Sequence, residues 1–120
     1  MKWTNTDYTA GQGDKNDCSV RAYMVAACVS YENAYRLFTK HGRGLGKRTR
    51  FNTTNAVIRE TFPQASYFQP HISLKRFVTH HPKGHYILHN KHHAFALCDG
   101  VIHDWNKHPR YKIQVAWKLV

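Results

Sequence analysis

The chain has 120 residues, of which 18 are Lys or Arg and 7 are Asp or Glu, so the net charge is +11 with neutral His. This length suits one domain with its own core, and a hydrophobic share of 42% excludes a disordered basic tail. The longest apolar stretch, Tyr23–Val29, is far shorter than the ~20 residues of a membrane span. No signal peptide is visible, and three widely spaced cysteines without a CxxC motif fit a reducing compartment. We therefore expect a single cytoplasmic domain over 1–120 with no membrane contact.

Helical periodicity organises the first two thirds of the chain. Residues 1–15 are polar and predict an extended or looping lead-in. Asn16 or Asp17 then forms a good helix N-cap, and apolar residues follow at the spacing of one helix face. The same pattern recurs further on, with stops at Gly or Pro. We expect helices over about 17–29, 31–41, 54–62 and 74–80, a flexible basic loop over 42–50, and a short strand near 65–68.

The last third alternates apolar and polar residues, which is typical of strands. Asp99-Gly100 stands between two apolar runs and predicts a two-residue hairpin turn. Helices first and antiparallel strands second predict an α+β fold, with the N-terminal helices packed on one face of a small antiparallel sheet. We expect strands over 85–89, 94–98, 101–105 and 111–119.

Cys18 lies at the first turn of the first expected helix. Backbone N–H groups without helical partners and the helix dipole favour a negative charge there, and a lowered pKa makes a cysteine a thiolate nucleophile. Cys28 and Cys98 lie on expected apolar faces, where a cysteine packs as a small apolar residue. By position alone, Cys18 could also be a small packed residue. A nearby base with an orienting partner would distinguish a nucleophile from that alternative.

The expected hairpin supplies a candidate base. A two-residue turn sets His93 opposite Asn106 and Phe95 opposite Asp104, and directly opposed side chains share one face of a sheet. Either Asp104 or Asn106 can accept a hydrogen bond from one ring nitrogen of His93. The other ring nitrogen then remains for the cysteine.

An acyl-transfer transition state also needs hydrogen-bond donors for its oxyanion. The backbone N–H of Cys18 is one such donor. The side-chain amide of Gln12 is a natural second donor, because a Gly-containing loop between the two residues can fold Gln12 back.

These residues together resemble the papain-like cysteine protease superfamily. The run Gln12–Cys18 resembles the Gln-x4-Asp-Cys motif of C39-type peptidases and has the Gln-to-Cys spacing of papain-like proteases. His93–Leu97, the turn and Ile102–Asp104 resemble the His strand, hairpin and Asp/Asn strand of the same superfamily. Asn16–Ala22 and Pro82–Leu88 look like segments of small papain-like proteins of phages and bacteria.

The resemblance implies a papain-like fold and a cysteine-dependent peptidase, or a related acyl-transfer enzyme, acting on an amide or isopeptide bond. It makes Cys18 the nucleophile, His93 the general base and acid, Asp104 the orienting residue and Gln12 part of the oxyanion hole. Ser19 stands where C39 peptidases have Gly. The implied partner is a protein or peptide substrate, met in the cytoplasm, or in the host cytoplasm for a phage protein.

The charge of +11 supports a second interpretation, a catalytically inactive papain-like scaffold that binds nucleic acid or protein through a basic surface. The candidate polyanion-binding residues are Arg43, Lys47, Arg48 and Arg50, in a run without an acidic residue. On an active enzyme the same cations favour an acidic substrate. Candidate base-stacking aromatic residues are Trp3, Tyr67, Tyr86, Trp105 and Tyr111.

Ten histidines raise the question of metal binding. No HExxH motif and no Cys/His finger spacing is present in the sequence. We therefore predict no metal site and no cofactor, and we expect the histidines to add positive charge below about pH 6.5.

Overall fold

The computed structural model spans residues 1–120 and describes residues 1–4, 16–44, 46–91, 93–104 and 110–120. Its helices are α1 (Cys18–Ala27), α2 (Tyr31–Lys40), α3 (Phe51–Thr61) and α4 (Leu74–His80). Its strands are β1 (Lys2–Thr4), β2 (Ser66–Phe68), β3 (Ile72–Ser73), β4 (His85–His89), β5 (Ala94–Cys98), β6 (Val101–His103), β7 (Lys112–Ile113) and β8 (Val115–Lys118).

Two of the predicted helix caps are present, whereas Asp17 before α1 makes no side-chain cap hydrogen bond. The side-chain oxygens of Ser30 and Ser73 accept backbone N–H groups and cap α2 and α4, as the predicted ranges require. α1 ends two residues earlier than expected because Cys28 adopts a left-handed conformation, with φ 58°. α3 begins at Phe51 rather than at residue 54, after Arg50 in an extended conformation.

The sheet is mixed rather than wholly antiparallel. Its strand order is β1-β6-β5-β4-β8-β2, and β1 pairs in parallel with β6. The extended or looping lead-in predicted over 1–15 is extended at residues 2–4, but their pairing as a strand was not predicted, because the partner lies far along the chain. The strand predicted over 111–119 is divided into β7, which pairs with β3, and β8, which lies between β4 and β2. The strand predicted over 101–105 ends at His103.

The hairpin between β5 and β6 has the predicted register. Leu97 pairs with Ile102 and Cys98 with Val101, which leaves a two-residue turn. Both turn residues have positive φ, 48° at Asp99 and 82° at Gly100, as a type I′ turn requires. The same register carries Asp104 to the position opposite Phe95, one residue beyond β6.

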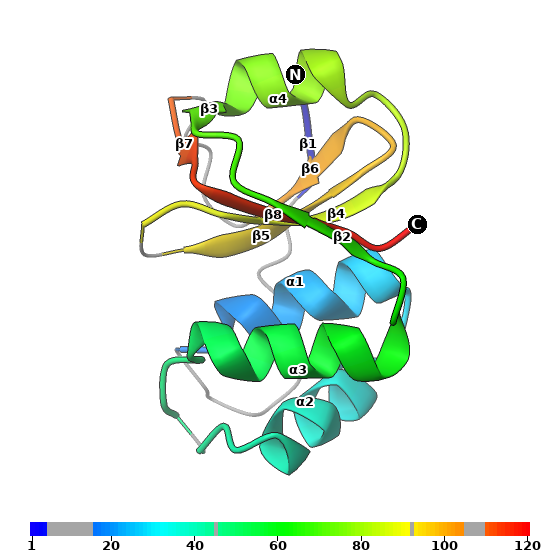
Figure 1. Ribbon diagram of the computed structural model, residues 1–120, viewed down its shortest axis with the longest axis vertical. Helices are drawn as coiled ribbons and strands as arrows, with labels where there is room; N and C mark the ends of the chain where they lie inside the picture. Colours follow the sequence, from blue (N-terminus) through cyan, green and yellow to red (C-terminus); the bar gives the residue numbers. More distant parts are fainter. Residues whose placement is uncertain (5–15, 45, 92, 105–109) are drawn as a thin grey trace.

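Helices cover both faces of the sheet. α1 lies against β4 and β5 and packs on α2, and α2 also packs on α3. Figure 1 shows these three helices on one side of the sheet and α4, with β3 and β7, on the other. The chain therefore has an α+β fold, but the prediction of helices on one face alone was wrong, because α4 covers the second face.

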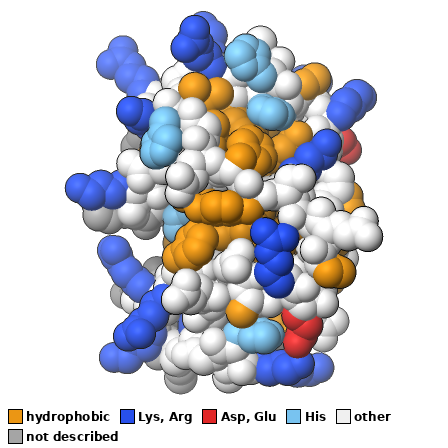
Figure 2. Space-filling view, in the orientation of Figure 1, with side chains coloured by type: hydrophobic (Ala, Val, Ile, Leu, Met, Phe, Trp, Pro, Cys, Tyr) orange, Lys and Arg blue, Asp and Glu red, His pale blue; other side chains and the backbone are white. Residues whose placement is uncertain are grey.

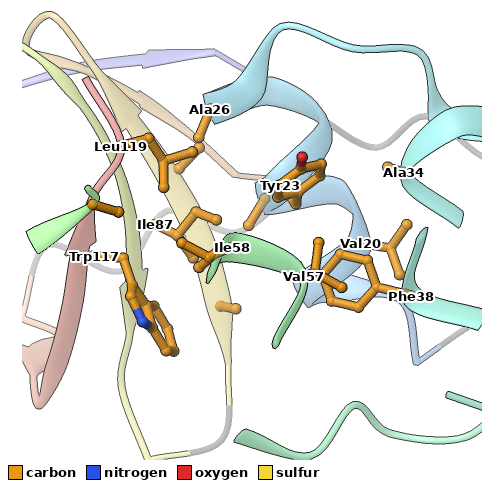
Figure 3. Close-up of a cluster of buried hydrophobic side chains, with 14 of the residues drawn as sticks. Val20, Tyr23, Ala26, Ala34, Phe38, Val57, Ile58, Ile87, Trp117 and Leu119 are labelled. Atoms are coloured by element: carbon orange, nitrogen blue, oxygen red, sulfur yellow. The ribbon is translucent and has the colours of Figure 1, made fainter. Parts of the chain in front are cut away.

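Each face of the sheet has its own buried cluster, so the sheet is the middle layer of the structure. The cluster between the sheet and α1–α3 is drawn in Figure 3. Side chains alternate along β4, so Ile87 joins that cluster, whereas Tyr86 and Leu88 join the cluster under α4. In the part of the chain that the structure describes, no helix is long and apolar enough to cross a membrane.

Truncation of Phe77 tests whether α4 covers a core on the second face of the sheet. Its side chain is fully buried and contacts the rings of Phe68 and Tyr86. We expect Phe77→Ala to lower the free energy of unfolding by about 3–5 kcal/mol, as truncation of a buried Phe does. Phe51→Ala is the matched control, because Phe51 is 45% exposed, and should cost less than half as much in urea unfolding. Equal losses from the two variants would show that α4 does not cover a core.

Candidate active site

Cys18 is the first residue of α1 and is partly exposed. The preceding residue, Asp17, is only 3% exposed. Its carboxylate accepts hydrogen bonds from Arg21 Nε at 3.0 Å and from the Tyr31 hydroxyl at 2.7 Å. Because Tyr31 begins α2, this buried carboxylate ties the start of α1 to the next helix and fixes where Cys18 lies.

His93 stands immediately before β5, in the loop that joins it to β4. Asn90 closes this loop in two ways: its side-chain oxygen accepts the N–H of His93 at 2.7 Å, and its own N–H donates to the carbonyl of His93 at 3.0 Å. Asn90 was not among the predicted site residues. Its signal in the sequence is an Asn at the end of a strand, which is typical of turns but does not by itself indicate a site.

Asp104 follows β6, and its side chain is fully buried. Its Oδ1 accepts a 2.7 Å hydrogen bond from Nε2 of His93. Its backbone N–H donates to the carbonyl of Thr4 at 3.0 Å, so the unexpected strand β1 holds Asp104 in place. The structure thus brings Cys18, His93 and Asp104 together, and Nδ1 of His93 remains for the Cys18 sulfur.

The two reactive groups titrate in opposite directions from their ordinary values. Burial by itself raises the pKa of Cys18, but hydrogen bonds from His93, the Ala94 backbone and Ser19 outweigh it and lower the pKa below 9.0. Burial by itself lowers the pKa of His93, but its hydrogen bonds to Asp104 and Cys18 raise the pKa to about 9. The arrangement therefore shifts the pair towards a thiolate beside an imidazolium.

Two of these contacts were missed by the sequence analysis. Ser19 stands where C39-type peptidases have Gly, and its hydroxyl is one of the groups that lower the pKa of Cys18. The backbone N–H of Ala94 is another, and it lies next to His93 in the chain. The Ala94 contact has no signal in the sequence, because it depends on where α1 meets the start of β5, whereas Ser19 is the neighbour of Cys18 in α1.

Aromatic rings line the other side of His93. The ring of Phe95 stacks on it with centroids 5.9 Å apart, and the ring of Tyr111 lies 6.0 Å away. Burial, and then the charges of Asp104 and Cys18, raise the pKa of the Tyr111 hydroxyl. Tyr111 was predicted only as a base-stacking residue, whereas the structure places it at the site.

The backbone at the start of α1 offers donors for an oxyanion. The first helical hydrogen bond of α1 runs from the N–H of Arg21 to the carbonyl of Asp17. The N–H groups of Cys18 and Ser19 precede it and have no partner within the helix. Gln12, the predicted second donor, and Asn106, the alternative orienting residue, lie outside the described residues.

A second Cys-His-Asp group shows why geometry matters more than residue type. Cys28 Sγ lies 3.9 Å from Nδ1 of His85, and Nε2 of His85 lies 3.6 Å from Asp99. However, Nδ1 of His85 is 3.0 Å from the carbonyl of Ala26, so this nitrogen carries a proton that it donates and cannot take one from Cys28. Cys28 also lies at the C-terminal end of α1, away from the backbone N–H groups at the helix start that could hold an oxyanion.

Cys98 and the candidate base-stacking tyrosines pack within the protein. Burial raises the pKa of the Cys98 thiol to about 12. Tyr86 is 2% exposed, so its ring is not open to a base, and the partly exposed ring of Tyr67 packs on Phe51 and Trp117. Trp105 lies outside the described residues. Among the residues that are described, no group of three His, Cys, Asp or Glu side chains has an arrangement that holds a metal ion.

No protein-family model, curated protein or solved structure matches this chain.

Asp104→Asn tests the contact that raises the pKa of His93. Stability gained from a raised histidine pKa is complete below the ordinary value of 6.5 and is lost as the pH rises through about 9. We therefore expect Asp104→Asn to lower the unfolding temperature more at about pH 6 than at about pH 10. Asp99→Asn is the matched control, because Asp99 has an exposed side chain and contacts a different histidine. A penalty for Asp104→Asn that is the same at both pH values would contradict the assignment.

Proposed function

We propose that this protein is a cysteine-dependent peptidase, or a related acyl-transfer enzyme, that acts on an amide or isopeptide bond with a papain-like arrangement of Cys18, His93 and Asp104. One observation carries the proposal: Nε2 of His93 bonds to a buried carboxylate at 2.7 Å, and the same ring is the partner that lowers the pKa of the cysteine that begins α1. A base that is oriented by a third group is the arrangement that activates a nucleophile. The opposite pKa shifts of Cys18 and His93 support the same function.

The reaction proceeds in two halves. The Cys18 thiolate attacks the carbonyl carbon, a C–S bond forms, and the negative charge moves to the carbonyl oxygen near the N–H groups that open α1. When the C–N bond breaks, the leaving amine takes the proton of His93. A pKa of about 9 keeps that proton on His93 at neutral pH until it is needed.

The second half returns the enzyme to its starting state. Neutral His93 takes a proton from water or another acceptor, which attacks the acyl carbon. The C–S bond breaks, the product carboxylic acid or new acyl compound leaves, and Cys18 is again a thiolate beside imidazolium. Asp104 stabilises the imidazolium in both halves and keeps Nδ1 of His93 directed at sulfur.

A papain-like fold belongs to the same proposal. Its support is the order of the parts: a nucleophile at the start of the first helix, a base at the start of a later antiparallel strand, and an acid at the end of the next strand. The helix that carries Cys18 lies against the strand that follows His93. This packing brings the two parts of the site together across the interface between a helix and the sheet.

Acylation by p-nitrophenyl acetate tests the nucleophile and base. We expect release of p-nitrophenol with an acetyl group on Cys18, found by peptide mass mapping. His93→Ala should slow the acylation about 100-fold or more, within the range of general acid–base catalysis. Cys28→Ala is the matched control, because Cys28 is exposed and contacts His85, and it should leave the rate unchanged. Equal rates for Cys18→Ala and Cys28→Ala would refute the proposal.

A pool of peptides from digested, denatured protein tests the class of bond in the same experiment. The expected result is a set of new peptide termini with the unmodified chain and none with Cys18→Ala. Acylation of Cys18 by the ester without any cleaved or transferred amide would overturn the peptidase assignment.

A further inference from the structure

A basic cleft lies between α2 and α3. It has a volume of about 780 Å³, and its cationic lining residues are Arg43, Lys47, Arg48 and Arg50, with His41 beside them. Among the described residues no Asp or Glu lines it, although Glu60 contacts His41 from outside the lining at 3.4 Å. In Figure 2, Lys and Arg side chains gather along one side of the molecule with few acidic side chains among them. A concave surface lined by one sign of charge focuses the electrostatic potential.

Buried contacts hold the loop that forms the cleft in place. Arg43 is only 5% exposed, lies 5.5 Å from the centre of the Tyr35 ring, and donates to the carbonyl of Asn16 at 3.1 Å. The backbone turns at Gly42 and Gly46, where φ is 102° and 70° and a side chain would be strained. The exposed cations Lys47, Arg48 and Arg50 therefore project from a loop that a buried arginine anchors.

The same anchor places the cleft beside the candidate active site. The side-chain amide of Asn16 donates to the carbonyl of Gly46 at 2.7 Å, which adds a second bond between the loop and this residue. Asn16 is two residues before Cys18, a path of about 8 Å between α-carbons at most. In Figure 1 the connection between α2 and α3 lies at the same end of the helical layer as the start of α1.

The lining suits an acidic peptide better than a single-stranded nucleic acid. Single strands bind through aromatic side chains that stack on bases, and no Phe, Tyr or Trp is among the described lining residues. The guanidinium groups of Arg48 and Arg50 match carboxylates in two-point hydrogen bonds. A peptide bound next to the nucleophile also presents the carbonyl that the proposed chemistry needs.

We propose that this cleft is a substrate-binding site that holds an acidic segment of the polypeptide whose carbonyl meets Cys18. This assignment rests on the proposed function, because it makes the bound peptide a substrate. The cleft binds carboxylate side chains through Lys47, Arg48 and Arg50, and Arg43 supports the loop from beneath.

Binding of a fluorescein-labelled peptide of alternating Glu and Gly tests the cleft, measured by fluorescence anisotropy on the full chain with Cys18→Ala so that no peptide is consumed. We expect the double substitution Lys47→Glu and Arg48→Glu to weaken binding about tenfold or more, because it opposes like charges. The matched control is Lys75→Glu with Arg76→Glu, which changes the net charge equally on the exposed side of α4 and should weaken binding less than about twofold. Lys47→Gln with Arg48→Gln, a milder pair, should give an intermediate loss.

Three outcomes would overturn the inference. Equal weakening by the two charge reversals would mean that only net charge matters. Absence of binding at low salt would leave the acylation of Cys18 standing but remove the acidic substrate. Tighter binding of a labelled oligothymidylate, lost in the cleft variant, would make the cleft a nucleic-acid site. Binding in the cleft without acylation of Cys18 in the unmodified chain would instead refute the proposed function and with it the role of the peptide as substrate.

Discussion

The hydrogen bond between Nε2 of His93 and the buried carboxylate of Asp104 is the interaction on which the site depends. At 2.7 Å it fixes which ring nitrogen faces the cysteine, and it holds the pKa of His93 near 9. Burial by itself disfavours the Cys18 thiolate, and the His93 ring is the largest of the contributions that lower the pKa of Cys18 against it. The reactivity of Cys18 therefore depends on Asp104, which acts on it through His93.

A different element of the fold positions each of the three residues Cys18, His93 and Asp104. β1 binds the backbone of Asp104, the β4–β5 loop closes on Asn90 to place His93, and buried Asp17 anchors the helix that begins at Cys18. The group around Cys28 and His85 lacks this support, because the nitrogen that faces Cys28 donates to a carbonyl and the sulfur lies at the wrong end of α1. The same three residue types at two places thus differ in what they can do.

Local signals predicted the parts of the site that depend on short-range geometry. The dipeptide Asp99-Gly100 set the hairpin register, so the meeting of His93 with Asp104 was predictable from the sequence. The helix start near Cys18 was also predicted, although Asp17 makes no side-chain cap there and its carboxylate bonds Arg21 and Tyr31 instead. The parallel pairing of β1, the division of the last strand that brings Tyr111 to the site, and the covering of the second face by α4 were not. Each depends on contacts between distant segments, which carry no local pattern. Gln12 and Asn106 lie outside the described residues and stay predictions.

The most direct test of this account is the pH titration of the Cys18 thiolate, followed by ultraviolet absorbance as the difference between the unmodified chain and Cys18→Ser. We expect the thiolate signal to appear below the ordinary cysteine pKa of 9.0, and to move to higher pH in His93→Ala. A signal that appears only near pH 9.0, and at the same pH with and without the His93 ring, would contradict the thiolate–imidazolium pair and the chemistry proposed from it.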